Sequence, residues 1–140
     1  MIETTARCSI PEIFEQSGEQ HFRELENEAL DKAILRETPA VIALGGGALM
    51  RDENRKSVRG QVVVWLTAEP ATLVDRLRGD RNRPLLYGNS LEEVIPLRLG
   101  ERQSSYEETA NFVVSTDHRS EEEIAREVLE LSKWPILEST

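Results

Sequence analysis

The sequence predicts an α/β fold in which helices cover a parallel sheet. Three apolar runs rich in β-branched residues indicate buried strands, at residues 41–44, 61–66 and 111–115. Segments in which apolar residues recur at helical spacing lie around and between these runs. This alternation is typical of a parallel sheet with right-handed crossover connections. We expect a single domain over residues 1–140, because no repeat, low-complexity tract or linker interrupts the chain.

The first long helix is predicted before residue 35. Its apolar residues recur at helical spacing: Phe22, Leu25, Ala29, Ala33 and Ile34. Ser17 and Gln20 have the spacing of a capping box, so we expect the helix to begin there.

Three glycines follow the first predicted strand directly. The run Val41–Leu44 is continuously apolar, and Gly45, Gly46 and Gly47 come after it. They leave bare backbone at the carboxyl end of a strand, where α/β proteins bind their ligands. One or two glycines would satisfy an ordinary turn. Three in a row predict that a ligand comes within van der Waals distance of the main chain.

Two more helices are marked by their first residues. Pro70 suits the first turn of a helix, and Ser120 with Glu123 has the spacing of a second capping box. Pro96 should break or kink any helix between residues 90 and 99, because proline lacks the N–H that the helix needs.

The composition excludes several classes of protein. The formal net charge of -9 makes nucleic acid an unfavourable partner, because the surface as a whole repels polyanions. No apolar run is long enough to span a bilayer, and Met1–Ser9 has no signal-peptide core. The single cysteine, Cys8, excludes an internal disulfide. Neither it nor the two histidines stands in a metal-ligand spacing. We therefore expect a cytoplasmic protein that contacts no membrane.

One segment is locally basic against this acidic background. It contains four arginines: Arg76, Arg78, Arg81 and Arg83. The helix macrodipole accounts for Arg76 and Arg78 at the end of a helix. Arg81 and Arg83 lie beyond that helix, in a loop. We interpret residues 79–90 as a lid that closes over phosphates and screens developing charge; a solvated loop is the alternative.

Two further arginines are candidates for binding a small anion. Arg23 lies three residues before Glu26 on the first helix, and Arg102 lies four residues before Tyr106 on a later one. Taken singly, each is more simply explained by solvation, Arg23 in an exposed ion pair with Glu26. A planar guanidinium nevertheless matches a carboxylate through two parallel hydrogen bonds.

Five motifs, in order, resemble those of the shikimate kinase family. They are Ser9-Ile-Pro-Glu-Ile-Phe14, Gly18-Glu-Gln-His-Phe-Arg-Glu-Leu-Glu26, Gly45–Gly47, Arg83-Pro-Leu-Leu86 and Glu101-Arg-Gln-Ser-Ser-Tyr106. The resemblance runs from about Ile2 to Leu131. It implies a nucleoside-monophosphate-kinase-like fold, that is, a P-loop kinase fold with a lid. It also implies the reaction of ATP with shikimate to give shikimate 3-phosphate.

The resemblance also implies roles for particular residues. Arg23 and Arg102 would bind the shikimate carboxylate, and Gly45–Gly47 would offer backbone to its ring and hydroxyls. Arg83 would reach the ATP phosphates from the lid and act catalytically by offsetting charge during transfer. Arg119 falls where the family contacts adenine; a plain surface charge near a helix start is the equal alternative. Shikimate and ATP would be the partners, and the family is monomeric.

One part of the family pattern is absent from these residues. No Gly-x-x-x-x-Gly-Lys-Ser/Thr occurs in the 140 residues, and none of the three lysines follows a glycine. Magnesium is therefore implied by the family alone, because the residues that usually hold it are missing. We expect the chain to begin after the first two strands of the fold and to be catalytically incomplete by itself.

The missing pattern has a structural consequence. In the family, the strand before the phosphate loop lies between the strand ending at Gly45 and the one near residues 62–66. Without it, a gap of about 10 Å would separate the two, twice the usual strand spacing. Each buried backbone group left unpaired there would cost roughly 1–3 kcal/mol. We expect a chain that is marginal, rearranged, or dependent on self-association or a partner segment.

Three functions remain open at this point. The chain is a shikimate kinase, a non-catalytic relative that binds or regulates, or another small-molecule kinase of similar fold. The glycine triplet together with Arg23 argues against the third.

Overall fold

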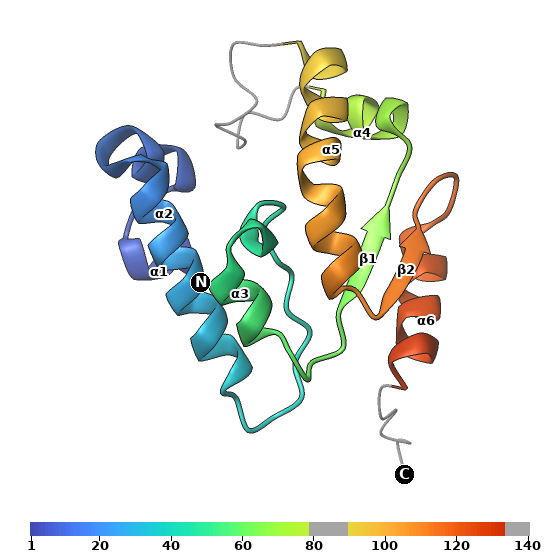
Figure 1. Ribbon diagram of the computed structural model, residues 1–140, viewed down its shortest axis with the longest axis horizontal. Helices are drawn as coiled ribbons and strands as arrows, with labels where there is room; N and C mark the ends of the chain where they lie inside the picture. Colours follow the sequence, from blue (N-terminus) through green and yellow to red (C-terminus); the bar gives the residue numbers. More distant parts are fainter. Residues whose placement is uncertain (79–89, 134–140) are drawn as a thin grey trace.

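The computed structural model describes residues 1–78 and 90–133, and the predicted lid with Arg81 and Arg83 lies outside this part. Figure 1 shows the arrangement of the elements. In chain order they are α1 (Ile2–Ala6), α2 (Ile10–Ile34), the 3₁₀ turn η1 (Ala48–Met50), α3 (Asp52–Ser57), β1 (Val64–Thr67), α4 (Pro70–Leu77), α5 (Leu91–Thr109), β2 (Phe112–Ser115) and α6 (Glu121–Ser132). None of the described helices has the length and apolar character needed to cross a membrane.

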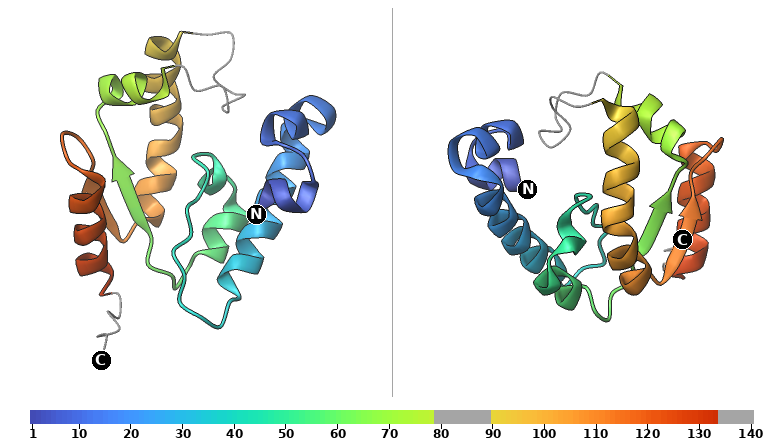
Figure 2. Two further views of the ribbon diagram at one scale, coloured as in Figure 1. Left: turned by 180° about the vertical axis from the view of Figure 1, so that it is seen from behind. Right: turned by 45° about the horizontal axis from the view of Figure 1, so that its top comes forward.

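The parallel sheet is confirmed in its second and third predicted strands. β1 and β2 pair in parallel, with Val64 opposite Phe112 and Thr67 opposite Ser115. Val114 is only 1% exposed, because α5 and α6 lie on opposite sides of the strand pair (Figure 1 and Figure 2). Val113 on β2 and Leu66 on β1 nevertheless remain 56% and 54% exposed, so the helices cover the apolar strands only in part.

The first predicted strand is wrong as an assignment. Residues 41–44 form no strand, and the sheet of the described residues contains β1 and β2 alone. A strand needs a hydrogen-bonded neighbour, and these residues take part in no backbone hydrogen bond to another described segment. Val41 is accordingly 82% exposed, and Leu66 on β1 is 54% exposed. Residues 41–44 therefore have the apolar sequence of a central strand but do not pair with another described strand.

The start of α2 also differs from the prediction. Ser9 caps the helix, and its capping box forms with Glu12 instead of between Ser17 and Gln20. Gly18, next to the predicted start, has a positive φ of 80° and divides α2 into two helical stretches, so a helix does resume beside the predicted site. Glycine tolerates that conformation, so the chain bends and resumes with Phe22 buried.

The remaining helices follow the sequence, except at Pro96. Helix α4 begins at Pro70, and Ser120 with Glu123 forms the predicted capping box of α6. The expected break at Pro96 is wrong, because α5 runs through this residue from Leu91 to Thr109. Pro96 lies just beyond the first turn, so it removes only one helical hydrogen bond. Burial of Val94 and Ile95 holds the helix together around it.

A second packed cluster joins α2 to the segment that follows it. Leu30, Leu49 and Val58 form its buried centre. Leu44 and Tyr106 pack against this centre from the extended segment and from α5. The cluster therefore fixes α2, η1 and α5 relative to one another around residues 45–47.

The exposed apolar residues predict weak cooperativity. We expect calorimetry to show a broad thermal transition of low enthalpy, because an isolated parallel pair is marginal and parallel strands are normally buried on both faces. We also expect association that increases with protein concentration in sedimentation velocity. A sharp cooperative transition in a monomer would contradict this expectation.

Two substitutions separate the sheet from exposed apolar surface in general. Leu66→Thr keeps a strand-forming residue on β1 and should weaken the association. Leu35→Gln removes a side chain that is 80% exposed at the end of α2 and should leave the association unchanged.

The capping box of α6 predicts a defined dependence of stability on pH. Hydrogen bonds from the backbone N–H and hydroxyl of Ser120 hold the pKa of Glu123 below its ordinary 4.5. The carboxyl of Glu123 is therefore protonated at a higher pH in the unfolded chain than in the folded one. The capping box stabilises the fold fully above about pH 4.5, and this stabilisation is lost as the pH falls through the lower pKa of the folded state. When the free energy of unfolding in urea is measured from pH 7 to pH 3, Glu123→Gln should lose less stability toward acid pH than the unchanged chain. Glu121→Gln, in the same turn without a capping contact, should behave like the unchanged chain.

Candidate functional site

The three glycines form a turn that side chains from two helices approach closely. A Cβ placed on Gly45 would lie 2.5 Å from Oε1 of Glu26. On Gly46 it would lie 2.5 Å from Nη1 of Arg102, and on Gly47 2.5 Å from Nη2 of Arg23. None of the three glycines has a positive φ, so close approach and not backbone conformation requires glycine here. The close neighbours in the structure are the protein's own side chains, where the sequence led us to expect a ligand.

Arg23 is held in a partly buried ion pair. Its Nη1 lies 2.7 Å from Oε2 of Glu26, whose residue is 6% exposed, and its Nη2 lies 3.5 Å from Glu19. The prediction of an exposed ion pair between Arg23 and Glu26 is therefore wrong, because the pair is partly buried. The guanidinium also lies over the ring of Phe22, 5.1 Å from its centroid. Since Phe22 is buried, it fixes the helix face from which Arg23 reaches Gly47.

Arg102 reaches the turn from the opposite side. It lies on α5 one turn before Tyr106, so both side chains are on the same face of the helix. The Tyr106 hydroxyl donates a hydrogen bond to the carbonyl of Gly46. Among the described residues Arg102 forms no ion pair, in contrast to Arg23.

Two asparagines fix the turn from beneath. Nδ2 of the fully buried Asn54 donates to the carbonyl of Ala48 at 2.8 Å. Its Oδ1 accepts a hydrogen bond of 2.7 Å from Asn27 on α2, next to Glu26. Backbone bonds from Ala48 to Gly45 and from Met50 to Gly47 complete η1. The turn and the Arg23 helix are thus tied to the same buried group.

The electrostatics of the turn favour a small monoanion. Arg23 is paired with two carboxylates that differ in burial, because Glu26 is 6% exposed and the Glu19 side chain is 53% exposed. Water screens the attraction of Glu19, and Arg102 has no ion-pair partner among the described residues. Burial raises the pKa of the Tyr106 hydroxyl, and the charges of Arg102 and Arg23 oppose that shift only in part. The hydroxyl keeps its proton at neutral pH and acts as a donor. A guanidinium fork and neighbouring N–H groups match a carboxylate or a phosphate through parallel hydrogen bonds.

The other predicted arginines have partners elsewhere in the structure or lie outside the described residues. Arg83 lies outside the described residues. Arg119 lies after β2, where its Nη1 is 2.6 Å from Glu127 and donates to the Ser115 carbonyl at 2.9 Å. Arg76 binds the hydroxyl and carbonyl of Thr116 at 2.8 and 3.0 Å, so it joins α4 to the end of β2 instead of serving the helix end alone.

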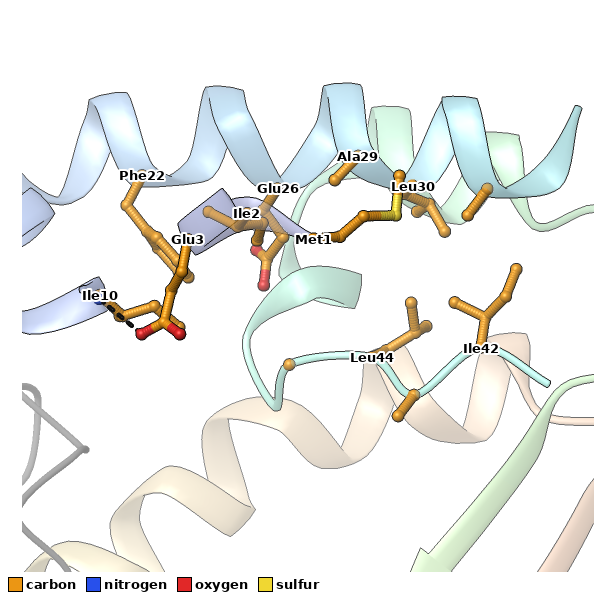
Figure 3. Close-up of a pocket in the computed structure, with 13 residues that line it drawn as sticks. Met1, Ile2, Glu3, Ile10, Phe22, Glu26, Ala29, Leu30, Ile42 and Leu44 are labelled. Atoms are coloured by element: carbon orange, nitrogen blue, oxygen red, sulfur yellow. Dashed lines mark hydrogen bonds between the residues drawn. The ribbon is translucent and has the colours of Figure 1, made fainter. Parts of the chain in front are cut away.

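A separate apolar pocket of about 320 Å³ lies beside the turn. Figure 3 shows Ile42 and Leu44 pointing from the extended segment toward α2, with Glu26 near the end of the pocket at the turn. Neither Arg23 nor Arg102 lines it. Its apolar lining suits packing and not anion binding, so we do not assign the anion to it.

Two residues of the site had no binding role assigned from sequence. They are Glu26 and Tyr106, which contact the glycine turn. Two signals existed, because each lies three or four residues after an arginine on the same helix and each ends one of the five motifs. Spacing shows which side chains share a helix face, and it does not show which backbone group that face meets.

Comparisons with known proteins agree on one family. The family model for shikimate kinase matches residues 1–133. The shikimate kinase of Synechococcus sp. (strain CC9902) is 39% identical over 132 residues, which cover 94% of this chain and 68% of that protein. The one from Rhodopirellula baltica is 40% identical over 134 residues, covering 92% and 71%.

Solved structures give the same picture. Shikimate kinase from Acinetobacter baumannii, in complex with shikimate, matches with a TM-score of 0.88 and 32% identity, covering 93% of this chain and 73% of that one. Shikimate kinase from Bacteroides thetaiotaomicron matches with a TM-score of 0.82 and 29% identity, covering 94% and 79%. The α/β assignment is therefore confirmed at the level of the whole fold.

The close approach to the glycines predicts an order of stability among alanine variants. Gly47→Ala should lower the free energy of unfolding by about 3 kcal/mol, because the Cβ displaces a guanidinium that neutralises a buried carboxylate. Gly46→Ala should cost less than about 1 kcal/mol, because the unpaired end of Arg102 can move away. Urea unfolding measures both values.

Gly100→Ala is the matched control on α5. Nothing lies within 4 Å of its Cβ position, so it should stabilise the helix by about 0.8 kcal/mol. Equal losses in Gly46→Ala and Gly47→Ala would show that the ion pair of Arg23 does not distinguish the two positions.

Proposed function

The chain belongs to the shikimate kinase family, and from that premise we propose that it binds shikimate for ATP-dependent phosphorylation to shikimate 3-phosphate. Arg23 and Arg102 bind the carboxylate. The backbone of Gly45–Gly47 contacts the ring and its hydroxyls, with Gly46 foremost. This makes the chain part of a phosphotransferase acting on an alcohol group.

One observation supports this proposal above the others. Guanidinium groups from two helices lie against successive glycines of one turn, and that of Arg102 has no ion-pair partner among the described residues. Shikimate carries a single carboxylate and hydroxyls on a small ring, so it matches both the guanidinium groups and the bare backbone. Arg23 is already oriented by Glu26, which reduces the entropy lost when the acid binds.

The nucleotide side of the reaction is proposed from fewer residues. Arg83 in the lid would contact the ATP phosphates and offset charge during transfer, and Arg119 would contact adenine. The 140 residues contain no Gly-x-x-x-x-Gly-Lys-Ser/Thr, and the described ones place no three acidic, His or Cys side chains together to hold a metal ion. The residues present therefore do not fit magnesium, and we derive no step through it.

The second candidate function is a non-catalytic module that binds shikimate or regulates through it. The observation in its favour is that both arginines proposed for the acid lie at the glycine turn, whereas Arg119, proposed for adenine, is paired with Glu127 on α6. A coupled ATPase assay with shikimate separates the candidates: turnover supports the kinase, and binding without turnover supports the module. For either function we propose a cytoplasmic protein whose partners are small molecules. We propose that the protein is monomeric when its sheet is fully paired.

Isothermal titration with shikimate tests the acid site directly, since binding involves residues that the structure describes. We expect Arg102→Lys to raise the Kd about tenfold or more, because lysine keeps the charge but loses the two parallel hydrogen bonds. Arg126→Lys, an exposed pair with Glu122 on α6, should leave the Kd unchanged.

Shikimate methyl ester provides the control on the ligand. Lacking the carboxylate charge, it should bind far more weakly than shikimate. Equal binding of acid and ester, or no binding of shikimate at all, would overturn the assignment of Arg23 and Arg102.

A further inference from the structure

We propose that Tyr106 is a positioning residue of the acid site. Its hydroxyl fixes the peptide unit between Gly46 and Gly47, so that the Gly47 N–H is kept as a donor for the bound acid. This inference rests on the proposed function for the identity of the acid. The positioning itself can be tested without any ligand.

The first argument is the geometry of a single peptide unit. The Gly46 carbonyl and the Gly47 N–H belong to the same planar peptide and point in opposite directions. Tyr106 donates to that carbonyl, so one hydrogen bond sets the direction of both groups. A peptide between two glycines has few steric restraints of its own. The bonds from Ala48 to Gly45 and from Met50 to Gly47 hold the residues on either side, but among the described residues it is Tyr106 that bonds to this peptide itself.

The second argument is an N–H group without a partner. Gly47 is buried, yet among the hydrogen bonds of residues 1–78 and 90–133 its N–H donates to no backbone or side-chain acceptor. Its carbonyl, in contrast, accepts from Met50. Buried N–H groups are nearly always paired in folded proteins. The missing acceptor therefore points to a ligand atom, next to the Arg23 guanidinium that surrounds the same residue.

The third argument is that Tyr106 is itself held rigidly. Its ring meets that of Trp65 on β1 edge to face, with 5.5 Å between centroids and 67° between planes. The ring also packs against the cluster of Leu30, Leu49 and Val58. Burial raises the pKa of the hydroxyl, which keeps it a donor. A ring held by both contacts can orient a flexible peptide and not merely follow it.

Tyr106→Phe tests the proposal, with Thr109→Val as the matched control. Both remove one hydroxyl hydrogen bond from α5, but that of Thr109 goes to Ser105 on the same helix and not to the turn. In ¹H–¹⁵N spectra without ligand, only Tyr106→Phe should shift the Gly47 amide and speed its hydrogen exchange. Titration should show the Kd for shikimate raised about tenfold in Tyr106→Phe and unchanged in Thr109→Val.

The outcomes distinguish this inference from the proposed function. An unchanged Gly47 amide and Kd in Tyr106→Phe overturn the positioning role. Equal effects of the two variants on the Kd also overturn it, because they show a general loss of stability. If the unchanged chain does not bind shikimate, the proposed function fails. In that case the Gly47 amide signal of ligand-free Tyr106→Phe decides whether Tyr106 positions the peptide. If Tyr106→Phe does not fold, the unchanged chain decides: shikimate must shift the Gly47 amide, and binding without that shift overturns the inference.

Discussion

The close packing of side chains against the Gly45–Gly47 backbone is the constraint on which the site depends. Each glycine has a charged side-chain atom where its Cβ would stand, so any larger residue would move a member of the site. Two of these atoms come from α2 and one from α5, which are far apart in sequence. The conformation of the turn therefore depends on the positions of both helices. The same close packing explains why three consecutive glycines occur where an ordinary turn would need one or two.

Charge pairing decides what this turn can bind. Glu26 is buried beside Arg23, and a buried ion pair is poor evidence for stability because desolvation offsets much of the attraction. Its effect is better described as orientation, since Glu26 holds one guanidinium in place beside Gly47. Arg102 has no ion-pair partner among the described residues, so its guanidinium is the group that we propose attracts the anion. This local positive charge contrasts with the formal net charge of -9, because the surface as a whole repels anions.

Sequence reasoning succeeded where local interactions decide the structure and failed where distant ones do. β1, β2, α4 and the cap at Ser120 follow from strand propensity, proline and capping chemistry that act within a few residues. The strand at 41–44 failed because pairing needs a neighbour, and the break at Pro96 failed because burial of its neighbours sustains α5. Arg23 and Arg102 could be named from motif spacing. The roles of Glu26 and Tyr106 could not, because no local pattern shows that α2 and α5 meet the same turn.

The residues proposed for the acid and for the nucleotide have different structural requirements. Those proposed for the acid lie on α2, α5 and the glycine turn, which pack around Leu30, Leu49 and Val58. Arg119, proposed for adenine, follows β2 and is paired with Glu127 on α6. The strand pair still reaches the acid residues, because Trp65 on β1 contacts the ring of Tyr106, whose hydroxyl bonds to the Gly46 carbonyl. Incomplete pairing of the sheet would therefore act on the glycine turn through that contact, whereas the apolar cluster holds α2 and α5 together.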